Sequence, residues 1–503
     1  MLYHANITIF AYNMKKLFYL ILMLCFLCTP KVHAVGHWTS GWGASGTLSG
    51  GTGQYLPFWA HTGQNGIVPT TSNALLTLGA GAAYNHSNGF FYESGCNFAG
   101  WLASVPNGGV TVNGAVDRLY VSAGWKMLRA ELGIAPRQRE LGDLSVTGGN
   151  MMWTSNARNL PGINVKSDWI PIFKWFALRG NVAHYKMNDN RAVVGTMLHN
   201  KSLEGKITIN SRVSISGGLE HIAQWGGYSE RLGAQPSSLG DFVRVFFAMN
   251  GGDDALETDK INVLGNHLGR EYVRIDWQAE RFGLLLQYDK PFEDGSGLRL
   301  LNVPDGVWTV KLDLKDKSFV NEIVYEYVNT TWQSGPRHDR PATLMEKWEQ
   351  DPSDPYYGRI SLRGCDNYFV NGVYVSGWTY DGRIIGLPLI GGLVFDKDGI
   401  VRDVSCSRVR AHHIGIGGNF AEGCPYKFKA TCSRNYGRYN QSAASVFASY
   451  PLQLSMALEV GIQNRLSRLP VDFWVGVYSD LGQLYQDSFG LTLKVVRRNL
   501  RTF

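Results

Sequence analysis

Three segments of the chain combine cationic, amide and tryptophan side chains, which are the residue types that suit sugar binding. The segments are Arg137-Gln138-Arg139-Glu140, Trp153 through Asn156 to Arg158, and His221 through Gln224 to Trp225. Aromatic faces stack on pyranose rings, and arginine and amide groups hydrogen-bond hydroxyls and carboxylates. The pattern therefore predicts a carbohydrate site. The alternative is that each of these side chains only takes part in an ion pair that stiffens the protein interior.

The adjacent histidines His412 and His413 are a second feature. Neighbouring residues of a strand point to opposite faces, so this pair cannot easily hold one metal ion. We expect one histidine to face the interior beside Arg408 and Arg410, as a hydrogen-bonded wall residue, and the other to face outward. No spacing of histidines and cysteines suggests zinc, so the sequence predicts no metal and no cofactor.

Motifs of catalysis are missing from the sequence. It contains no G-x-S-x-G elbow, no H-E-x-x-H pair and no P-loop. Gly415-Ile416-Gly417-Gly418 is a glycine cluster, but we expect no helix after it, which argues against a nucleotide site. The sequence therefore predicts a protein that is not an enzyme.

The net charge limits the classes of binding partner, and the number of cysteines limits the possible disulfide bonds. The net charge is +7 without a basic cluster, so we expect no nucleic-acid site and a mild preference for anionic ligands. Beyond residue 34 the cysteines are Cys96, Cys365, Cys406, Cys424 and Cys432. This odd number cannot all pair within one chain. Cys424 and Cys432 could bridge a hairpin or stay free.

The elements that must position these side chains are predicted by the alternation of apolar and polar residues. Leu452 to Gln463 is the clearest run, with aliphatic residues on one face and mainly polar residues on the other. Residues 119–134 predict a hairpin with its turn at Lys126-Met127. Residues 273–288 and 308–327 show the same alternation.

A soluble β-sandwich or propeller would also alternate, but two features favour a membrane barrel. The apolar faces are aliphatic and aromatic over long strands, and the opposite faces mix Arg, Lys, Asp and Glu as a wet lumen does. A closed barrel also leaves no strand edge exposed to lipid. The 59 glycines and the 12% aromatic content agree with this class. One strand with its loop takes about 26 residues, which predicts about 16 to 20 strands, an even number.

Both ends of the chain agree with export to the outer membrane of a Gram-negative bacterium. Met14-Lys15-Lys16, the apolar run 17–28 and Val32-His33-Ala34 predict a signal peptide over residues 1–34, cleaved near Ala34. Met14 is then the expected natural start, and a short membrane anchor is the alternative. Residues 35–503 are expected to form one barrel domain. Its last strand, alternating from Phe489 to Val495 before the terminal Phe503, suits the outer-membrane assembly machinery.

The sequence also resembles a known family over nearly the whole mature chain. The matching stretches, in order, are Leu56-Pro57-Phe58-Trp59 with Asn65-Gly66, Gly148-Gly149 through Trp153 to Asn156-Ala157-Arg158, Gly218-Leu219-Glu220, Gln224-Trp225-Gly226-Gly227, Asn262 through Gly265-Asn266-His267-Leu268-Gly269, Tyr325-Glu326-Tyr327, Asp366-Asn367-Tyr368, Arg408-Val409-Arg410-Ala411-His412-His413, and Ser433-Arg434-Asn435-Tyr436-Gly437. Together they resemble the Wzi-type capsule assembly proteins, in the form common in Bacteroidetes.

The resemblance implies an all-β, transmembrane antiparallel β-barrel of about eighteen strands, with a lumen occluded by inward-folded loops. It implies a lectin-like protein that binds capsular polysaccharide or exopolysaccharide and helps to assemble or anchor it, without catalysis. Lipopolysaccharide and the assembly machinery are its other expected partners. Enterobacterial members place a small helical bundle before the barrel. Here the strand pattern begins near Trp38 and Trp42, so we expect no such bundle.

Combined with the chemistry above, these stretches give a candidate set of polysaccharide-binding residues. The set is Arg137, Arg139, Trp153, Asn156, Arg158, His221, Gln224, Trp225, Asn266, His267, Arg408, Arg410, His412 and Arg434. The competing function is a porin or a specific channel for sugars or other small solutes, which would need an open lumen with a charged constriction.

Overall fold

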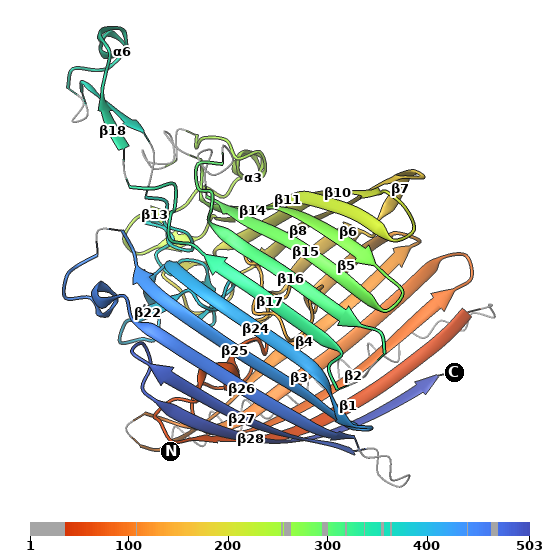
Figure 1. Ribbon diagram of the computed structural model, residues 1–503. Coiled ribbons are helices and arrows are strands. Elements are labelled where there is room, and N and C mark those ends of the chain that lie inside the picture. The colour runs from red at the N-terminus through yellow and green to blue at the C-terminus, as the bar shows by residue number, and fades with distance from the viewer. Residues whose placement is uncertain are drawn as a thin grey trace.

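The first and last strands of the chain are hydrogen-bonded to each other and so close a β-barrel (Figure 1). The computed structural model describes residues 36–502 apart from positions 107, 253–254, 256–262, 294–299, 317–318, 337, 354–356, 363–364, 440 and 464–470. The expected signal peptide over residues 1–34 and the start at Met14 lie outside the described residues. The predicted early beginning of the strand pattern is confirmed, because the first strand starts at Gly36.

Eighteen antiparallel strands form the wall in the described part of the chain, as predicted. The sheet has nineteen strand segments, but β6 and β7 pair in succession with β8 and act as one broken wall strand. The wall strands are β1 (Gly36–Gly51), β2 (Asn73–His86), β3 (Phe90–Ser104), β4 (Val110–Trp125), β5 (Leu128–Ile134), β6 (Gly162–Ser167) with β7 (Ile170–Phe173), β8 (Phe176–Lys186), β10 (Met197–Thr208), β11 (Val213–Trp225), β14 (Asn266–Gln278), β15 (Phe282–Phe292), β16 (Gly306–Leu314), β17 (Glu322–Asn329), β24 (Arg408–Ala421), β25 (Cys424–Gly437), β26 (Leu452–Gln463), β27 (Val471–Gly482) and β28 (Ser488–Thr502).

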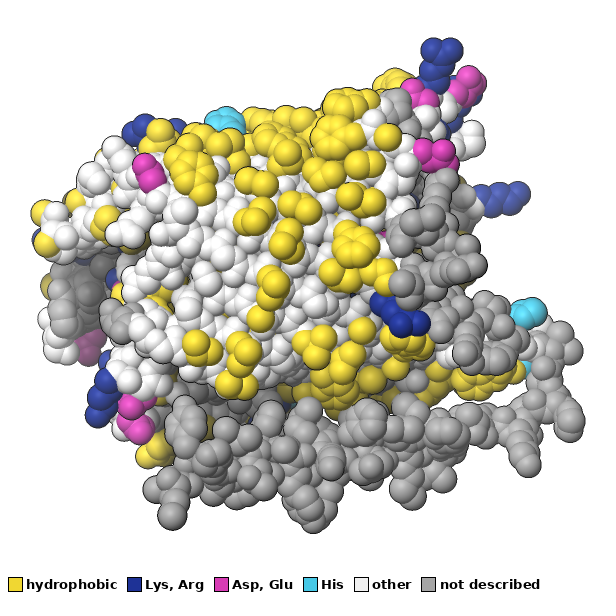
Figure 2. All heavy atoms as spheres, turned by 90° about the horizontal axis from the view of Figure 1, so that it is seen from below, with side chains coloured by type: hydrophobic (Ala, Val, Ile, Leu, Met, Phe, Trp, Pro, Cys, Tyr) yellow, Lys and Arg dark blue, Asp and Glu magenta, His cyan; other side chains and the backbone are white. Residues whose placement is uncertain are grey.

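Apolar side chains cover the outside of the wall, as the alternation predicts. Leu458, Val475 and Leu493, on the neighbouring strands β26, β27 and β28, are exposed, whereas Ser455 and Thr492 are buried toward the lumen. Figure 2 shows hydrophobic side chains spread over the wall, with most charged side chains near its margins. A surface that faces the hydrocarbon of a bilayer requires this distribution.

The two ends of the barrel differ. Short turns, such as the predicted one at Lys126-Met127, join the strands at the end where β28 finishes, which we call the turn end. The long connections lie at the opposite, loop end (Figure 1). They contain the small elements α2 (Phe58–His61), β9 (Val193–Val194), β12 (Tyr228–Ser229), β13 (Gly233–Ala234), α3 (Leu239–Phe246), β18 (His338–Pro341), α6 (Leu344–Trp348), β19 (Arg359–Leu362), β20 (Thr379–Tyr380), β21 (Arg383–Ile384), β22 (Gly391–Phe395), β23 (Val401–Cys406) and the 3-10 helix η1 (Val446–Ser449). None of the helices in the described residues has the length and apolar character needed to cross a membrane.

Parts of three long connections fold back into the barrel and bind one another. We call residues 52–72, 135–161 and 366–390 together the plug. The backbone nitrogen of Thr154 donates to the carbonyl oxygen of Ile385 at 2.9 Å. The Arg383 guanidinium donates to the carbonyl oxygen of Val68 at 2.7 Å. These bonds join the three segments, which are far apart in the sequence, into one body.

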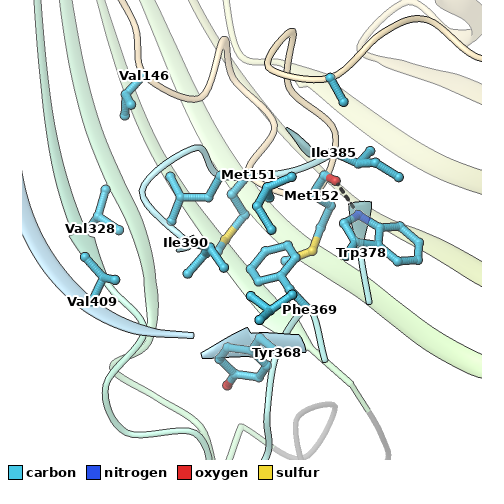
Figure 3. Close-up of a cluster of buried hydrophobic side chains, with 14 of the residues drawn as sticks. Val146, Met151, Met152, Val328, Tyr368, Phe369, Trp378, Ile385, Ile390 and Val409 are labelled. Carbon is cyan, nitrogen blue, oxygen red and sulfur yellow. Dashed lines mark hydrogen bonds between the residues drawn. The ribbon is translucent and has the colours of Figure 1, made fainter. Parts of the chain in front are cut away.

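A hydrophobic core joins the plug to the wall (Figure 3). Met151, Met152 and Trp378 of the plug are fully buried and pack among Tyr368 and Phe369. The wall contributes buried apolar residues from strands β10 to β27, namely Leu198, Ile222, Leu268, Val307, Val328, Val409, Ala411, Ala457 and Tyr478. Apolar positions on an inward face make sense only if protein covers them, since a wet lumen favours polar residues. The expected inward folding of the loops is thereby confirmed.

Inward carboxylates of the wall hold the backbone of the plug. Glu326 of β17 accepts hydrogen bonds from the backbone nitrogen of Val146 at 2.6 Å and from the hydroxyl of Ser145 at 2.8 Å. Asp480 of β27 accepts one from the backbone nitrogen of Phe58 at 2.9 Å, at the start of α2. A buried carboxylate is costly unless such bonds satisfy it, so each one is a fixed point of attachment.

The bridge between Cys424 and Cys432 that the sequence left open does not exist. Both cysteines belong to β25, on one extended strand, where their separation is about 27 Å. A disulfide needs Cα atoms closer than about 7 Å. Cys96, Cys365 and Cys406 are free as well.

Candidate functional site

A cavity of about 1050 Å³ lies in the lumen between the plug and the part of the wall that includes β1, β2, β27 and β28. It exists because most inward positions of two strands carry short side chains. These positions are Thr39, Gly41, Gly43, Ser45, Thr47 and Ser49 on β1 and Thr77, Gly79, Gly81 and Ala83 on β2. These side chains are too short to fill the space between the wall and the plug. The space is at the upper end of the range for small-ligand pockets, about 300–1,000 Å³.

Lysines and tryptophans meet at the edge of this lumen cavity. The Lys429 ammonium of β25 lies 4.2 Å from the ring centre of Trp59 in α2. The Lys427 ammonium binds the Asp143 carboxylate at 2.9 Å and lies 5.7 Å from the ring of Trp474 on β27. Cations over aromatic rings attract each other, and this fixes both partners in place. The partly exposed ring of Trp474 offers a flat face for a sugar.

Arg139 reaches the same cavity from the plug. Its guanidinium donates to the carbonyl oxygen of Gly63 at 2.6 Å and pairs with Asp143 at 2.7 Å. Burial of Asp143 opposes its ionisation, but Lys427 and Arg139 outweigh burial and lower the pKa of Asp143 to about 2. The carboxylate therefore stays charged at any physiological pH and holds both cations at the cavity edge.

Arg137 lies between this cavity and a second one. Its guanidinium donates to the carbonyl oxygens of Thr154 at 2.6 Å and Arg158 at 2.8 Å, and lies 4.5 Å from the ring of Trp153. Burial lowers the pKa of Arg137 to about 9. The Nε atom has no hydrogen-bond partner among the described residues. A buried donor without a partner is available to an acceptor group of a ligand.

The second cavity, of about 250 Å³, lies between residues 135–161 of the plug and the wall strands β5 to β14. Trp153 packs on Tyr185 with ring centres 5.2 Å apart. Arg179 binds Glu140 at 2.9 Å. Burial raises the pKa of Glu140, but Arg179 and Arg274 outweigh it and hold this pKa below the usual value. The smaller cavity is therefore lined by an aromatic pair and by the ion pair of Arg179 with Glu140.

The two cavities share the composition of carbohydrate sites. Aromatic faces, amides and cations on a rigid scaffold recognise hydroxyls and acid groups. Among the described residues, no group of three or more His, Cys, Asp or Glu side chains is placed to hold a metal ion. The geometry can bind a polar or anionic glycan.

The structure brings together five of the predicted site residues in the plug. These are Arg137, Arg139, Trp153, Asn156 and Arg158. Arg137, Arg139 and Asn156 line the larger cavity, and Arg137 and Trp153 line the smaller one. Arg158 is held in an ion pair with Asp381 at 3.1 Å. Two of the three segments singled out in the sequence thus converge.

Gln224 and Asn266 face the lumen, but their side-chain amides already have hydrogen-bond partners within the protein. The Asn266 amide donates to Gln224 at 2.9 Å, and the Gln224 amide donates to the carbonyl oxygen of Gly377 at 3.0 Å. Both side chains are buried. They attach the plug to the wall and present nothing to a ligand.

His221, Trp225 and His267 lie on the outside of the barrel, away from the two lumen cavities. Alternation along β11 puts His221 and Trp225 on one face and Gln224 on the other, and the first face is the outer one. The imidazoles of His221 and His267 are 2.8 Å apart, and Phe242 of α3 packs on Trp225 with ring centres 5.6 Å apart. Helix α3 therefore covers part of the outer wall.

The expectation that Arg408 and Arg410 accompany the lumen-facing histidine was wrong. His413 faces inward, with Nδ1 2.8 Å from a threonine hydroxyl of β25 and Nε2 2.7 Å from a plug carbonyl. Residues two apart on a strand share a face, so Arg408, Arg410 and His412 all lie on the opposite, outer side. Arg434 of β25 is also on the outside.

Sequence reasoning missed several charged and aromatic residues that line the cavities. They are Trp59, Lys427, Lys429 and Trp474 at the larger cavity and Arg179, Glu204, Glu220 and Arg270 at the smaller one. A usable signal was present, because Lys427 and Lys429 are two positions apart on a strand with apolar residues between and around them. Alternation would have placed both on the inner face.

Comparison with known proteins gives the fold. No family model and no curated protein sequence matches the chain. Wzi, an outer-membrane protein involved in Group 1 capsule assembly in Escherichia coli and described as a carbohydrate-binding β-barrel, is similar in structure, with a TM-score of 0.50 and 12% identity over 90% of this chain and 83% of that one. OccK5 (OpdH) of Pseudomonas aeruginosa gives 0.43 and 7% over 92% and 98%, and OprD of the same organism gives 0.44 and 9% over 93% and 97%. At 12% identity the likeness to Wzi shows a shared barrel fold.

Proposed function

We propose that this chain is an outer-membrane protein of a Gram-negative bacterium that binds capsular or other surface polysaccharide and helps to assemble or anchor it. The packed core of the plug carries the proposal. Diffusion of solutes needs a water-filled path, whereas Met151, Met152 and Trp378 are buried without access to water where they meet the wall. A wall whose inward positions make apolar contacts with a plug is suited to binding a ligand and not to the diffusion of solutes.

Two further observations support a glycan as the ligand. The cavities beside the plug join tryptophans to cations, as at Trp59 with Lys429 and at Trp153 with Arg137. The Wzi barrel, which shares the fold, is described as carbohydrate-binding and as involved in capsule assembly. The excess of lysine and arginine favours an acidic polysaccharide.

The proposal includes the route and the partners of the protein. A signal peptide cleaved near Ala34 directs the chain to the outer membrane, where the assembly machinery inserts it among outer-membrane lipids, lipopolysaccharide included. Binding requires no cofactor, and the protein performs no catalysis. Its role is to hold a polymer made elsewhere.

Deletion of the gene and binding by the purified protein test this function together. We expect the deletion strain to shed its surface polysaccharide into the medium, and the wild-type chain to restore retention. The purified full chain in detergent should bind oligosaccharides released from that polymer, measured by titration calorimetry. Normal retention in the deletion strain, together with no heat of binding, would refute the proposal.

A channel for sugars or other small solutes is the second candidate, and the 1050 Å³ lumen cavity favours it, because this space is polar and unfilled by the plug. Planar bilayers decide between the two functions. We expect the wild-type protein to give no discrete current steps. Regular steps that a small sugar blocks would make transport the leading function.

A further inference from the structure

Two arginines stand opposite each other on the outer wall near the loop end of the barrel. Arg410 of β24 and Arg434 of β25 are register partners, and both side chains are exposed. Directly opposed residues of an antiparallel pair have Cβ atoms about 4.5–5.5 Å apart, and like charges at this spacing repel. The sheet therefore has an unfavourable charge pair at this position.

Neither arginine has an acidic partner among the described residues. Arg410 contacts only neutral groups, with Nη2 3.5 Å from the hydroxyl of Thr331 and its guanidinium 5.9 Å from the ring of Tyr436. The Arg434 side chain makes no hydrogen bond or ion pair with any described residue. Arg438, a little further along the chain, is by contrast held by Asp403 through two bonds of 2.9 and 3.0 Å.

A third cation lies beside this pair. Arg408 donates to the carbonyl oxygen of Thr331 at 2.9 Å and its guanidinium lies 3.9 Å from the ring of Tyr439. We call Arg408, Arg410 and Arg434 the rim patch. Three outward guanidinium groups on two adjacent strands concentrate positive charge, and Arg410 and Arg434 have no acidic partner among the described residues.

The wall on the turn-end side of the rim patch changes from aromatic to aliphatic. His412 lies between Tyr325 and Tyr327, at ring distances of 6.2 and 5.1 Å, and its Nδ1 is 2.8 Å from the Tyr325 hydroxyl. The next outward positions are Ile414 on β24 and Leu454 on β26. Aromatic residues mark the headgroup level of a membrane barrel, and aliphatic residues mark its hydrocarbon level. The rim patch therefore lies at the height of lipid phosphates.

We propose that the rim patch binds the phosphate groups of a phosphorylated glycolipid of the outer leaflet, with the acyl chains of that lipid against the aliphatic wall below. A guanidinium group donates two parallel hydrogen bonds to a phosphate, and one phosphate between Arg410 and Arg434 removes their repulsion. This site is on the outside of the barrel, whereas the polysaccharide cavities are inside it. It depends on membrane placement and not on polysaccharide binding.

Substitution of Arg434 tests the site, because this side chain makes no described contact that folding needs. Native mass spectrometry of the full chain, released from detergent with added diphosphorylated lipid A, measures binding. We expect Arg434→Gln to bind about tenfold more weakly, which corresponds to about 1.4 kcal/mol, and Arg410→Gln/Arg434→Gln to bind more weakly still, since each variant loses charged hydrogen bonds to the phosphate. The matched control, Arg231→Gln/Arg402→Gln, removes equal charge from the loop end and should bind as wild type.

Three comparisons separate the possible ligands. Dephosphorylated lipid A with the same acyl chains should bind the wild-type protein as weakly as lipid A binds the double variant. Inorganic phosphate that binds as well as lipid A would overturn the lipid as the ligand. Unchanged lipid A binding by Arg434→Gln, or a loss confined to an acidic polysaccharide such as polygalacturonate, would overturn the site itself. Normal polysaccharide retention in the deletion strain, together with no glycan binding by the purified protein, would refute the proposed function and leave the lipid A result standing.

Discussion

The indole nitrogen of Trp378 donates a hydrogen bond to the main-chain oxygen of Met152 at 3.0 Å, although the two residues are 226 positions apart in the chain. A buried indole needs such an acceptor, since its nitrogen has only a donor to offer. Figure 3 shows the bond inside the hydrophobic cluster. Residues 135–161 and 366–390 therefore act as one packed unit across the lumen.

Removal of this tryptophan should loosen the plug and leave the wall intact. We expect Trp378→Ala to destabilise the plug by about 3–5 kcal/mol, the usual cost of deleting a buried aromatic side chain. Amide hydrogen exchange over residues 147–156 should speed up, and current steps should appear in planar bilayers. Trp348→Ala, at a position 90% exposed on α6, is the control and should change neither. Equal exchange in both variants would mean that the plug does not depend on this side chain.

The carboxylate of Glu326 is expected to hold residues 135–161 against β17. It accepts bonds from the backbone of Val146 and from the hydroxyls of Ser145 and Thr147. In Glu326→Ala these donors lose their acceptor, at about 1–3 kcal/mol for each that stays buried and unpaired. Limited proteolysis should then cut within residues 135–161, whereas Glu280→Ala in an exposed turn should resist as wild type does. An unchanged digestion pattern would contradict this attachment.

The rings of the larger cavity should contribute directly to glycan affinity. Trp474 faces the cavity beside Lys427. Loss of a stacking contact of about 1.4 kcal/mol weakens binding about tenfold, so Trp474→Ala should show this drop in titration calorimetry with oligosaccharides of the surface polymer. Trp277→Ala removes a tryptophan from the outer face of β14 and should bind normally. Equal affinity of the two variants would place the glycan elsewhere.

A buried carboxyl group makes one loop contact sensitive to pH. Asp305 accepts hydrogen bonds from the backbone of Trp332 at 2.9 Å and Gln333 at 2.6 Å and from the Tyr368 hydroxyl at 3.2 Å. Burial raises its pKa from 3.8 to about 6, although these bonds and Arg408 act in the opposite direction. Because the pKa is higher in the folded protein, the contribution to stability is full below pH 3.8 and is lost as pH rises through 6.

The free energy of opening at the Gln333 amide, measured by hydrogen exchange, should therefore fall between pH 4 and pH 7 by up to about 3 kcal/mol. Asp305→Asn cannot ionise, so its opening free energy should stay flat over that range. The same slope in wild type and variant would assign the pH dependence to another group.

Alternation along the strands could be read from the sequence, and with it most of the barrel. Leu452 to Gln463 forms β26 with its aliphatic side outward, and the turn at Lys126-Met127 joins β4 to β5. Apolar residues confined to one face identify that face as the one toward lipid. The rule does not identify the outer face where both faces are polar or aromatic, as around His412 and His413. Alternation then says which side chains share a face but not which face is outside.

The plug could not be derived from the residues in the same way. Met151 and Trp378 lie in irregular segments without periodicity, and their burial depends on contacts more than two hundred positions away. The family resemblance implied inward-folded loops, but chemistry alone gave only the arginines, Trp153 and Asn156. The segment from His221 to Trp225 divided because Gln224 turns inward while His221 and Trp225 lie outside under α3.

The barrel closes where β1 pairs with β28, and we call this pairing the seam. In the described residues, the hydrophobic core of the plug does not extend to it. Within the described residues neither strand contributes to the hydrophobic cluster, and the inward side of β1 between Thr39 and Ser49 is made of small residues that line the cavity. The bond from the Phe489 backbone to the Thr52 hydroxyl at the loop end of this seam spans 437 positions, so its closure costs more chain entropy than the pairing of consecutive strands. Away from its loop end, the inner side of the seam lines the cavity and contributes no described residue to the hydrophobic core of the plug. We therefore expect the wall to close last around loops that have already packed, so that folded segments never have to thread through a finished ring.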